Sequence, residues 1–355
     1  MQRGRTLRKD MARNIVGLLV LLVASCLIVL PYCMEYWPGS HDSLRYACLF
    51  SMFKDSFLAG NIYPRWLPDE YGGYGYPTFV FYQPGIFYLM LPFFLVCRDI
   101  LCSFVATAAV VVFAGGAGAF FLVEKIMGDF KAALFSALLF LLTPYLFVDL
   151  YVRGDMSELS AMMFAPWVLL AAVSLNRRFK EGGSGGGPLV LVSISLAAIV
   201  YLHPFVAMFM YLLVIAIIPP MMADTPKPAR GRYGIACLIA FACGAMLSSP
   251  YWLPAFMMRG EVDYSSALKG AYVASDNLVY PSQFFSRFWG YGHSRPGFDS
   301  DGLSFQLGLP HFILSVLGFA VCRSRKLIFG VFISYLACIF LMSTLSGFLW
   351  KNIPG

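Results

Sequence analysis

The sequence predicts an all-α polytopic membrane protein. Of its 355 residues, 59% are hydrophobic and only 13% are charged, whereas a soluble domain carries roughly 25% charged residues. Several apolar runs also have the length of about 20 residues that a membrane-spanning helix needs. The scarcity of charge excludes a soluble enzyme, a disordered segment and a nucleic-acid-binding module, so we expect no nucleic-acid partner.

The first apolar run, 14–33, follows a basic N-terminal stretch that includes Arg8, Lys9 and Arg13. A signal peptide begins in the same way, but this run stays apolar through residue 30 and other runs follow it. This favours an uncleaved anchor. Because cytoplasmic segments carry the excess of Lys and Arg, the N-terminus is predicted to be cytoplasmic.

The later apolar runs are counted by the charges between them. They are 78–97, 100–122, 132–151, 157–175, 188–222, 233–258, 303–322 and 327–343. Loops 176–187, 221–232 and 323–326 are rich in Arg and Lys and are therefore placed inside. As one helix the run 188–222 would be about 50 Å long, so we predict a hairpin that turns near His203-Pro204 at the outer face.

The run 78–97 is the one that does not fit as a crossing. Loops 34–77 and 152–156 both belong outside, so an even number of crossings must separate them. Pro84 and Pro92 interrupt 78–97, and we interpret it as an interfacial or re-entrant segment. The prediction is a single membrane domain, 1–355, with about nine spans and two large outer loops, 34–99 and 259–302.

The acidic side chains gather at the outer ends of the spans, as Asp42, Asp149, Asp155, Glu158, Glu261 and Asp263. Ion-coupled transporters usually keep charges at the midplane, so this pattern favours chemistry at the outer surface. Asp42 precedes 43–59, which we predict to be an amphipathic interfacial helix with Leu44, Cys48, Phe50 and Phe53 on its apolar side.

Each acidic position has a structural alternative. Asp42 is either a helix N-cap or a catalytic group, and Asp155 with Glu158 has nearly the spacing of a capping box. Aromatic residues of the first outer loop suit an interfacial belt or a surface for sugar rings. The four histidines lie far apart in the sequence and predict no metal cluster, and His203 and His311 are expected to be helix-packing donors.

With these residues placed, the chain resembles a known family over about residues 35–315. The motifs that carry the resemblance are His41-Asp42, Gly60-x-x-Tyr63-Pro64-Arg65-Trp66, Gly73-Tyr74-Gly75-Tyr76-Pro77, Tyr82-x-Pro84, Arg153-Gly154 with Glu158, Tyr251-Trp252-Leu253-Pro254 and Phe305-Gln306-x-Gly308. They are similar to those of the bacterial 6-pyruvoyl-tetrahydropterin synthase-related membrane proteins, whose architecture is akin to GT-C glycosyltransferases. The chain lacks the three-histidine zinc site of the soluble synthase, so that activity is not expected. Relatives continue beyond this C-terminus, and we expect a C-terminally truncated member.

The resemblance implies a GT-C-like bundle in the plasma (inner) membrane that transfers a sugar from a polyprenyl-phosphate carrier. Its partners would be membrane lipid and the lipid-linked sugar. The implied residues are Asp42 and His41 for catalysis, Asp155 and Glu158 for acceptor or metal support, Arg153, Arg259, Lys269 and Arg287 for the donor phosphate, and Trp66, Tyr74 and Trp252 for sugar stacking. The paired acids of several GT-C branches are absent, so the need for a divalent metal stays open. The alternatives are a transporter of a lipid-linked glycan, which the apolar midplanes disfavour, and a non-catalytic membrane protein.

Overall fold

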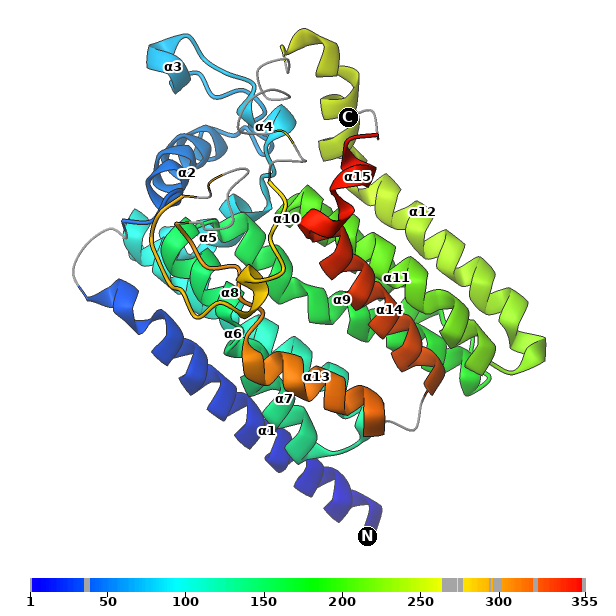
Figure 1. Ribbon diagram of the computed structural model, residues 1–355. Helices are drawn as coiled ribbons and strands as arrows, with labels where there is room; N and C mark the ends of the chain where they lie inside the picture. The colour runs from blue at the N-terminus through cyan, green and yellow to red at the C-terminus, as the bar shows by residue number, and fades with distance from the viewer. Residues whose placement is uncertain are drawn as a thin grey trace.

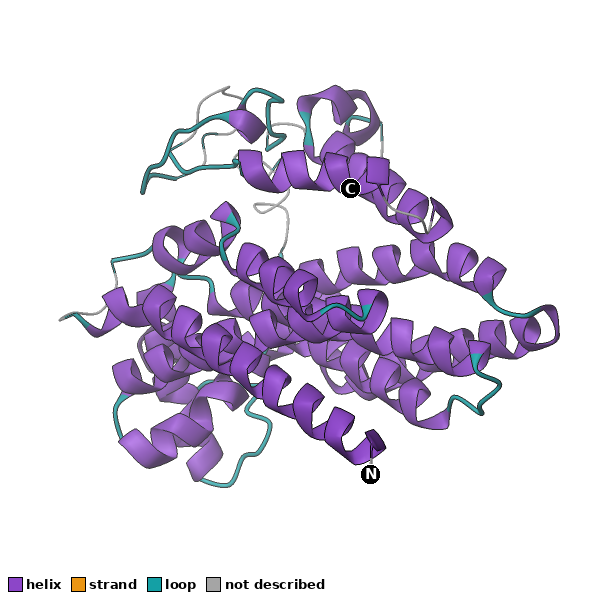
Figure 2. Ribbon diagram, turned by 90° about the horizontal axis from the view of Figure 1, so that it is seen from below, coloured by secondary structure: helices purple, strands orange, loops and turns teal. Residues whose placement is uncertain are grey.

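The computed structural model describes residues 2–34, 39–263, 273, 277–293, 295, 302–321 and 325–352. In these residues the protein is a helical bundle whose parts are joined mostly by short loops (Figures 1 and 2). The elements of the first outer loop gather at the end of the bundle that lies away from the N-terminus (Figure 1). The short helices of the loops and the C-terminal end include α3 Glu70–Gly73, η6 Gln283–Phe285, η7 Thr344–Ser346 and α15 Gly347–Trp350.

Five helical stretches of the described chain are long and apolar enough to cross a membrane. They are Met11–Cys33, formed by α1 (Gln2–Val29) and η1 (Leu30–Cys33), then α6 (Ile100–Met127), α9 (Met156–Lys180), α11 (Pro204–Asp224), and Lys227–Glu261, formed by α12 (Lys227–Met257) and η3 (Arg259–Glu261). A sixth candidate is α7 (Phe130–Leu141) joined to Pro144–Arg153 across a 44° bend. That second part consists of α8 (Pro144–Phe147) and η2 (Val148–Arg153).

The other predicted crossings are shorter apolar helices. These are α10 (Gly186–Leu202), α13 (Leu309–Val321) and α14 (Arg325–Met342). The structure therefore establishes five or six candidate spans in the described residues, and the count of nine stays a prediction. The predicted break at His203-Pro204 is confirmed, because α10 ends at Leu202 and α11 begins at Pro204.

The first outer loop contains short helices, as predicted. The run 78–97 is divided into α4 (Thr78–Phe81) and α5 (Gly85–Cys97). At 1.5 Å per residue, the 13 residues of α5 extend about 20 Å, less than the roughly 30 Å of a hydrocarbon core. This length agrees with an interfacial or re-entrant segment.

The helix predicted at 43–59 is confirmed as α2 (Ser43–Leu58), but the predicted apolar face is partly wrong. Leu44 and Cys48 are exposed, whereas Phe50 and Phe53 are buried. The buried side packs on α5, where both phenylalanine rings lie close to the ring of Phe87. The position of this partner helix, rather than the hydrophobic pattern of α2 alone, decides which face is covered.

The helix α9 contributes residues to both of the large hydrophobic clusters, and it carries charges of opposite sign at its two ends. Its first turn carries Glu158, and its last turn carries Arg177, Arg178 and Lys180. The 25 residues of α9 separate these ends by about 37 Å. The acidic end therefore lies far from the basic loop that predicts the cytoplasmic side.

Candidate functional site

The residues of the candidate site come from a tight turn that leads into α9. The segment η2 is a π-helix, Gly154 follows it with a φ of +68°, and Asp155 is the N-cap of α9. Single π-helical turns are uncommon and are frequent at functional sites. Here the turn places Asp149, Arg153, Asp155 and Glu158 together, and we call these four residues the Arg153 cluster.

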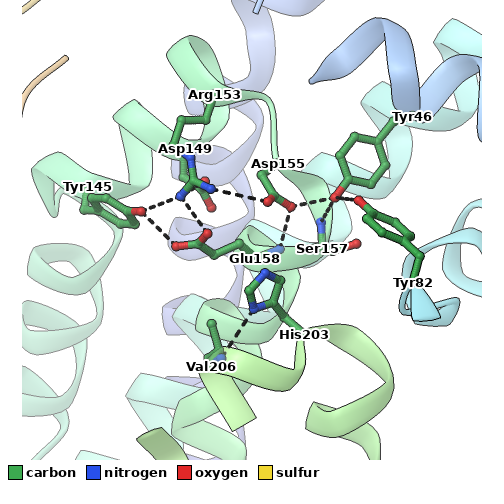
Figure 3. Close-up of polar contacts among 10 residues, drawn as sticks. All are labelled: Tyr46, Tyr82, Tyr145, Asp149, Arg153, Asp155, Ser157, Glu158, His203 and Val206. Atoms are coloured by element: carbon green, nitrogen blue, oxygen red, sulfur yellow. Dashed lines mark hydrogen bonds and ion pairs between the residues drawn. The ribbon is translucent and has the colours of Figure 1, made fainter. Parts of the chain in front are cut away.

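Three carboxylates surround the guanidinium of Arg153 (Figure 3). Nη1 lies 2.6 Å from Glu158 Oε2 and 3.4 Å from Asp149 Oδ1, while Nη2 lies 3.4 Å from Asp155 Oδ2. Arg153, which the resemblance implies for the donor phosphate, is therefore already engaged by acidic side chains. The cluster as a whole contains more negative than positive groups.

Tyrosine hydroxyls hold two of these carboxylates in place (Figure 3). Tyr46 donates to Asp155 Oδ1 at 2.6 Å and itself accepts a hydrogen bond from Tyr82 at 2.8 Å. Tyr145 donates to Glu158 Oε1 at 2.8 Å. Burial raises the pKa of Tyr46 and of Tyr82, so both remain protonated donors at neutral pH. The sequence reasoning missed all three tyrosines, although Tyr82 lies in one of the motifs of the resemblance.

Asp42 lies beside this cluster because two chain segments are paired through their main chains. The amide of His41 donates to Val152 O at 3.0 Å, and the amide of Asp42 donates to Arg153 O at 2.7 Å. The side chain of Asp42 makes no capping hydrogen bond to the described residues of α2. Asp42 is half-buried, and its pKa is raised by desolvation and then by the charge of Asp155, with Arg153 among the groups that oppose the shift.

Asp155 does cap its helix, as the structural alternative predicted. Its Oδ1 accepts a hydrogen bond from the amide of Glu158 at 2.9 Å. The same oxygen also receives the hydroxyl of Tyr46. Asp155 therefore combines a capping role with a place in the cluster.

The histidines occupy three different environments. The ring of His41 stacks on His293 with centroids 4.1 Å apart, and its Nε2 lies 3.1 Å from Tyr291 O, so it contacts the late outer loop. His311 Nε2 lies 2.8 Å from Leu139 O, which confirms its predicted packing role. His203 instead caps α11, where Nδ1 accepts from the Val206 amide at 3.3 Å.

His203 also lies beside two of the acids, a grouping that was not expected from the sequence. One ligand atom each of Asp155, Glu158 and His203 lies within 4.8 Å of the others. The three residues are all half-buried. Sequence spacing could not predict this arrangement, because His203 lies between α10 and α11, whereas the two acids lie at the start of α9.

The remaining predicted residues are dispersed. The guanidinium of Arg259 lies 4.1 Å from the centre of the Phe256 ring, Arg287 is exposed, and Lys269 lies outside the described residues. The predicted stacking residues all expose a large part of their surface, namely Trp66 52%, Tyr74 90% and Trp252 40%. Within the described contacts, no hydrogen bond or ion pair joins any of these residues to the Arg153 cluster.

The fold and its apolar helices define a multi-pass membrane protein. A profile of the 6-pyruvoyl-tetrahydropterin synthase related domain, described as a membrane protein, matches residues 79–354. The match covers more than half of the chain, so the chain belongs to this family, as the motifs predicted. It begins and ends later than the range 35–315 expected from the motifs. No curated protein and no solved structure matches the chain.

Proposed function

We propose that this chain transfers a sugar from a polyprenyl-phosphate carrier to an acceptor hydroxyl at the outer face of the membrane. The proposal follows the resemblance to GT-C enzymes and the position of the acidic groups. The Arg153 cluster lies at the end of α9 opposite the basic residues Arg177, Arg178 and Lys180. Because such basic residues mark the cytoplasmic side, the cluster would face outward.

The observation that carries the proposal is the placement of Asp42 next to the Arg153 cluster. Two main-chain hydrogen bonds hold it there, and its side chain is not used as a cap by the described residues of α2. Its raised pKa makes the carboxylate a stronger base than an aspartate in water. General bases work best when their pKa lies close to the working pH.

In the proposed step, Asp42 takes the proton of the acceptor hydroxyl. The oxygen forms a bond to the anomeric carbon as the bond from that carbon to the phosphate oxygen breaks. The carrier phosphate leaves with the electron pair, and the anomeric configuration is inverted. Developing negative charge on the phosphate needs cationic or hydrogen-bonding partners, and Arg259, Lys269 and Arg287 are proposed for this role.

The other residues would position the two substrates. Asp155 and Glu158 would accept hydrogen bonds from the acceptor, while Arg153, Tyr46 and Tyr145 hold their carboxylates in a defined orientation. His41 would hold the late outer loop near Asp42 through its contacts with Tyr291 and His293. The exposed rings of Trp66, Tyr74 and Trp252 are proposed as sugar-stacking surfaces.

The test uses purified protein in proteoliposomes with a panel of radiolabelled polyprenyl-phosphate hexoses and a membrane extract as the source of acceptor. We expect Asp42→Asn to lower the transfer rate about 10²–10⁴-fold, the usual contribution of a general base. Asp55→Asn is the matched control, because this residue lies on α2 but its side chain is 63% exposed and pairs with Lys54. Its transfer rate should equal that of the unmodified protein.

Three results would count against the proposal. Transfer at the unmodified rate by Asp42→Asn would remove Asp42 from the mechanism. Movement of the labelled carrier across the bilayer without sugar transfer would identify a transporter, and a folded protein that shows neither activity would support the non-catalytic alternative.

A further inference from the structure

The histidine His203 reaches the Arg153 cluster from a separate part of the chain. It lies between α10 and α11, whereas Asp155 and Glu158 belong to the start of α9. Its Nδ1 faces Val206, and the opposite edge of the ring faces the two carboxylates (Figure 3). The tertiary fold thus joins one imidazole and two carboxylates in a half-buried position.

The charges of this region are not balanced by the side chains around them. Asp149 is completely buried, and among the described residues neither of its carboxylate oxygens has a hydrogen-bond donor. Its ionic contact is Arg153, which also serves Asp155 and Glu158. Burying a carboxylate costs free energy unless a positive charge or a proton compensates it. A further cation in the cluster would therefore lower this cost.

We propose that Asp155, Glu158 and His203 bind a divalent transition-metal ion, with Zn²⁺ as the expected ion. Two carboxylates alone would suit Mg²⁺ or Ca²⁺, but imidazole is a ligand that favours zinc and its neighbours in the transition series. Asp149, whose ionic contact is Arg153, would compensate the charge of the ion without being a ligand. This inference goes beyond sugar transfer, because it concerns metal binding by the chain itself.

The surrounding hydrogen bonds are of the kind that orient metal ligands. Tyr46 holds Asp155, and Tyr145 holds Glu158. An ionised carboxylate has about four acceptor positions, so these contacts leave lone pairs for an ion. Outer hydrogen bonds of this type fix ligand orientation in metal sites.

The three ligand atoms would have to move closer together to share one ion. With metal–ligand bonds of about 2.0–2.2 Å in a tetrahedral arrangement, ligand atoms on one ion lie roughly 3.4 Å apart. The three atoms here lie within 4.8 Å of one another, so they would have to approach by at most about 1.4 Å. Coordination through Nε2 of His203 would put the imidazole proton on Nδ1 and release the Val206 amide. That cap hydrogen bond is long, at 3.3 Å, so its loss is a small cost.

The test measures metal binding by the full chain in detergent. Thiolates also bind Zn²⁺, and several cysteines are exposed, so the protein is first alkylated and then stripped with a chelator. Zn²⁺, Mn²⁺ or Mg²⁺ is added, and affinity is measured by competition with a chromophoric chelator. The bound metal is counted after desalting.

Two variants remove ligands without removing helix caps. Asparagine is a good N-cap, so His203→Asn keeps an acceptor for the Val206 amide, and Asp155→Asn keeps one for the Glu158 amide. His311→Ala is the control, since this imidazole contacts Leu139 instead of carboxylates. The thermal midpoint of the metal-free protein is recorded for each variant to confirm folding.

We expect the unmodified protein and His311→Ala to bind Zn²⁺ in a one-to-one ratio. His203→Asn and Asp155→Asn should lose at least about a hundredfold in affinity, since even loss of an outer hydrogen bond costs 10–100-fold. The proposal is overturned if the stripped protein takes up no ion, if His203→Asn binds as tightly as the unmodified chain, or if Mg²⁺ binds more tightly than Zn²⁺. None of these readouts depends on sugar transfer, so the two proposals can fail separately.

Discussion

The close approach of Gly154 to the segment 40–43 makes a sharp prediction for Gly154→Ala. A Cβ atom at this position would meet Ser40 Oγ, and it would lie 2.9 Å from Ser40 Cβ and 3.2 Å from Ser43 N. Gly154 also has a φ of +68°, which disfavours alanine. The substitution therefore adds backbone strain and pushes against the segment that carries Asp42.

A matched glycine separates the cost of backbone strain from the cost of the steric contact. Gly128 has the same φ of +68°, but among the described atoms nothing lies within 4 Å of its added Cβ. Gly128→Ala should cost only the left-handed backbone penalty of about 1–2 kcal/mol. Gly154→Ala should cost a further 1–3 kcal/mol or so, the usual range for overpacking.

The assay is reversible unfolding in mixed micelles, followed by tryptophan fluorescence, for both alanine variants and for Ser40→Gly combined with Gly154→Ala. Ser40→Gly removes the closest obstacle, and in the described structure Ser40 Oγ is buried without a hydrogen-bond partner, so little is lost with it. The double variant should recover the stability of Gly128→Ala. Equal losses for Gly154→Ala and Gly128→Ala, or no recovery in the double variant, would refute the proposed contact.

Three further predictions concern the polar groups. Tyr46→Phe should lower the unfolding free energy by about 1–3 kcal/mol, because the half-buried Asp155 carboxylate and the buried Ser157 amide both lose a hydrogen-bond partner. Arg153→Gln should cost about 3–5 kcal/mol, since it leaves the buried Asp149 and the half-buried Asp155 and Glu158 without their shared cation. Asp42→Asn should flatten part of the pH dependence of stability. In the folded state the pKa of Asp42 is raised above its ordinary value of 3.8. The contribution of Asp42 to the free energy of unfolding therefore falls as pH rises from 3.8 through the raised pKa.

Each of these predictions has its own control. Tyr74→Phe changes an exposed hydroxyl and should shift the unfolding free energy by less than about 0.5 kcal/mol. Arg177→Gln breaks an exposed pair with Glu181 and should cost less than about 1 kcal/mol. For Asp42, the readout is the thermal midpoint of Asp42→Asn minus that of the unmodified protein, measured across pH. This difference should grow as pH rises above 3.8, and growth toward low pH would contradict the sign. Losses in Tyr46→Phe or Arg153→Gln no larger than in their controls would show that the cluster does not stabilise the fold.

Features that depend on nearby residues were predictable from the sequence. The break at His203-Pro204 follows from an apolar run too long for one span and from a proline that suits a first helical turn. The helix at 43–59 and the division of 78–97 follow from local pattern and proline chemistry. The family could be recognised because its motifs are short and contiguous.

The contacts of the acidic residues needed the tertiary structure. Local spacing allowed Asp42 and Asp155 to be caps, but only Asp155 makes that hydrogen bond in the described chain. The difference arises because Asp42 is paired through its main chain with Arg153, more than a hundred residues later. No local pattern contains that information.

The amino-acid sequence alone was enough to identify an apolar multi-pass protein of the 6-pyruvoyl-tetrahydropterin synthase related family and to place the acids discussed above near helix ends. These properties depend on composition, run length and contiguous motifs. The folded chain was needed to reveal that Arg153 faces three carboxylates, that Tyr46 donates a hydrogen bond to Asp155, and that His203 lies beside Asp155 and Glu158. The physical reason is that helix packing, rather than sequence spacing, brings the turns before α9 and α11 and the helix α2 to the same end of the bundle.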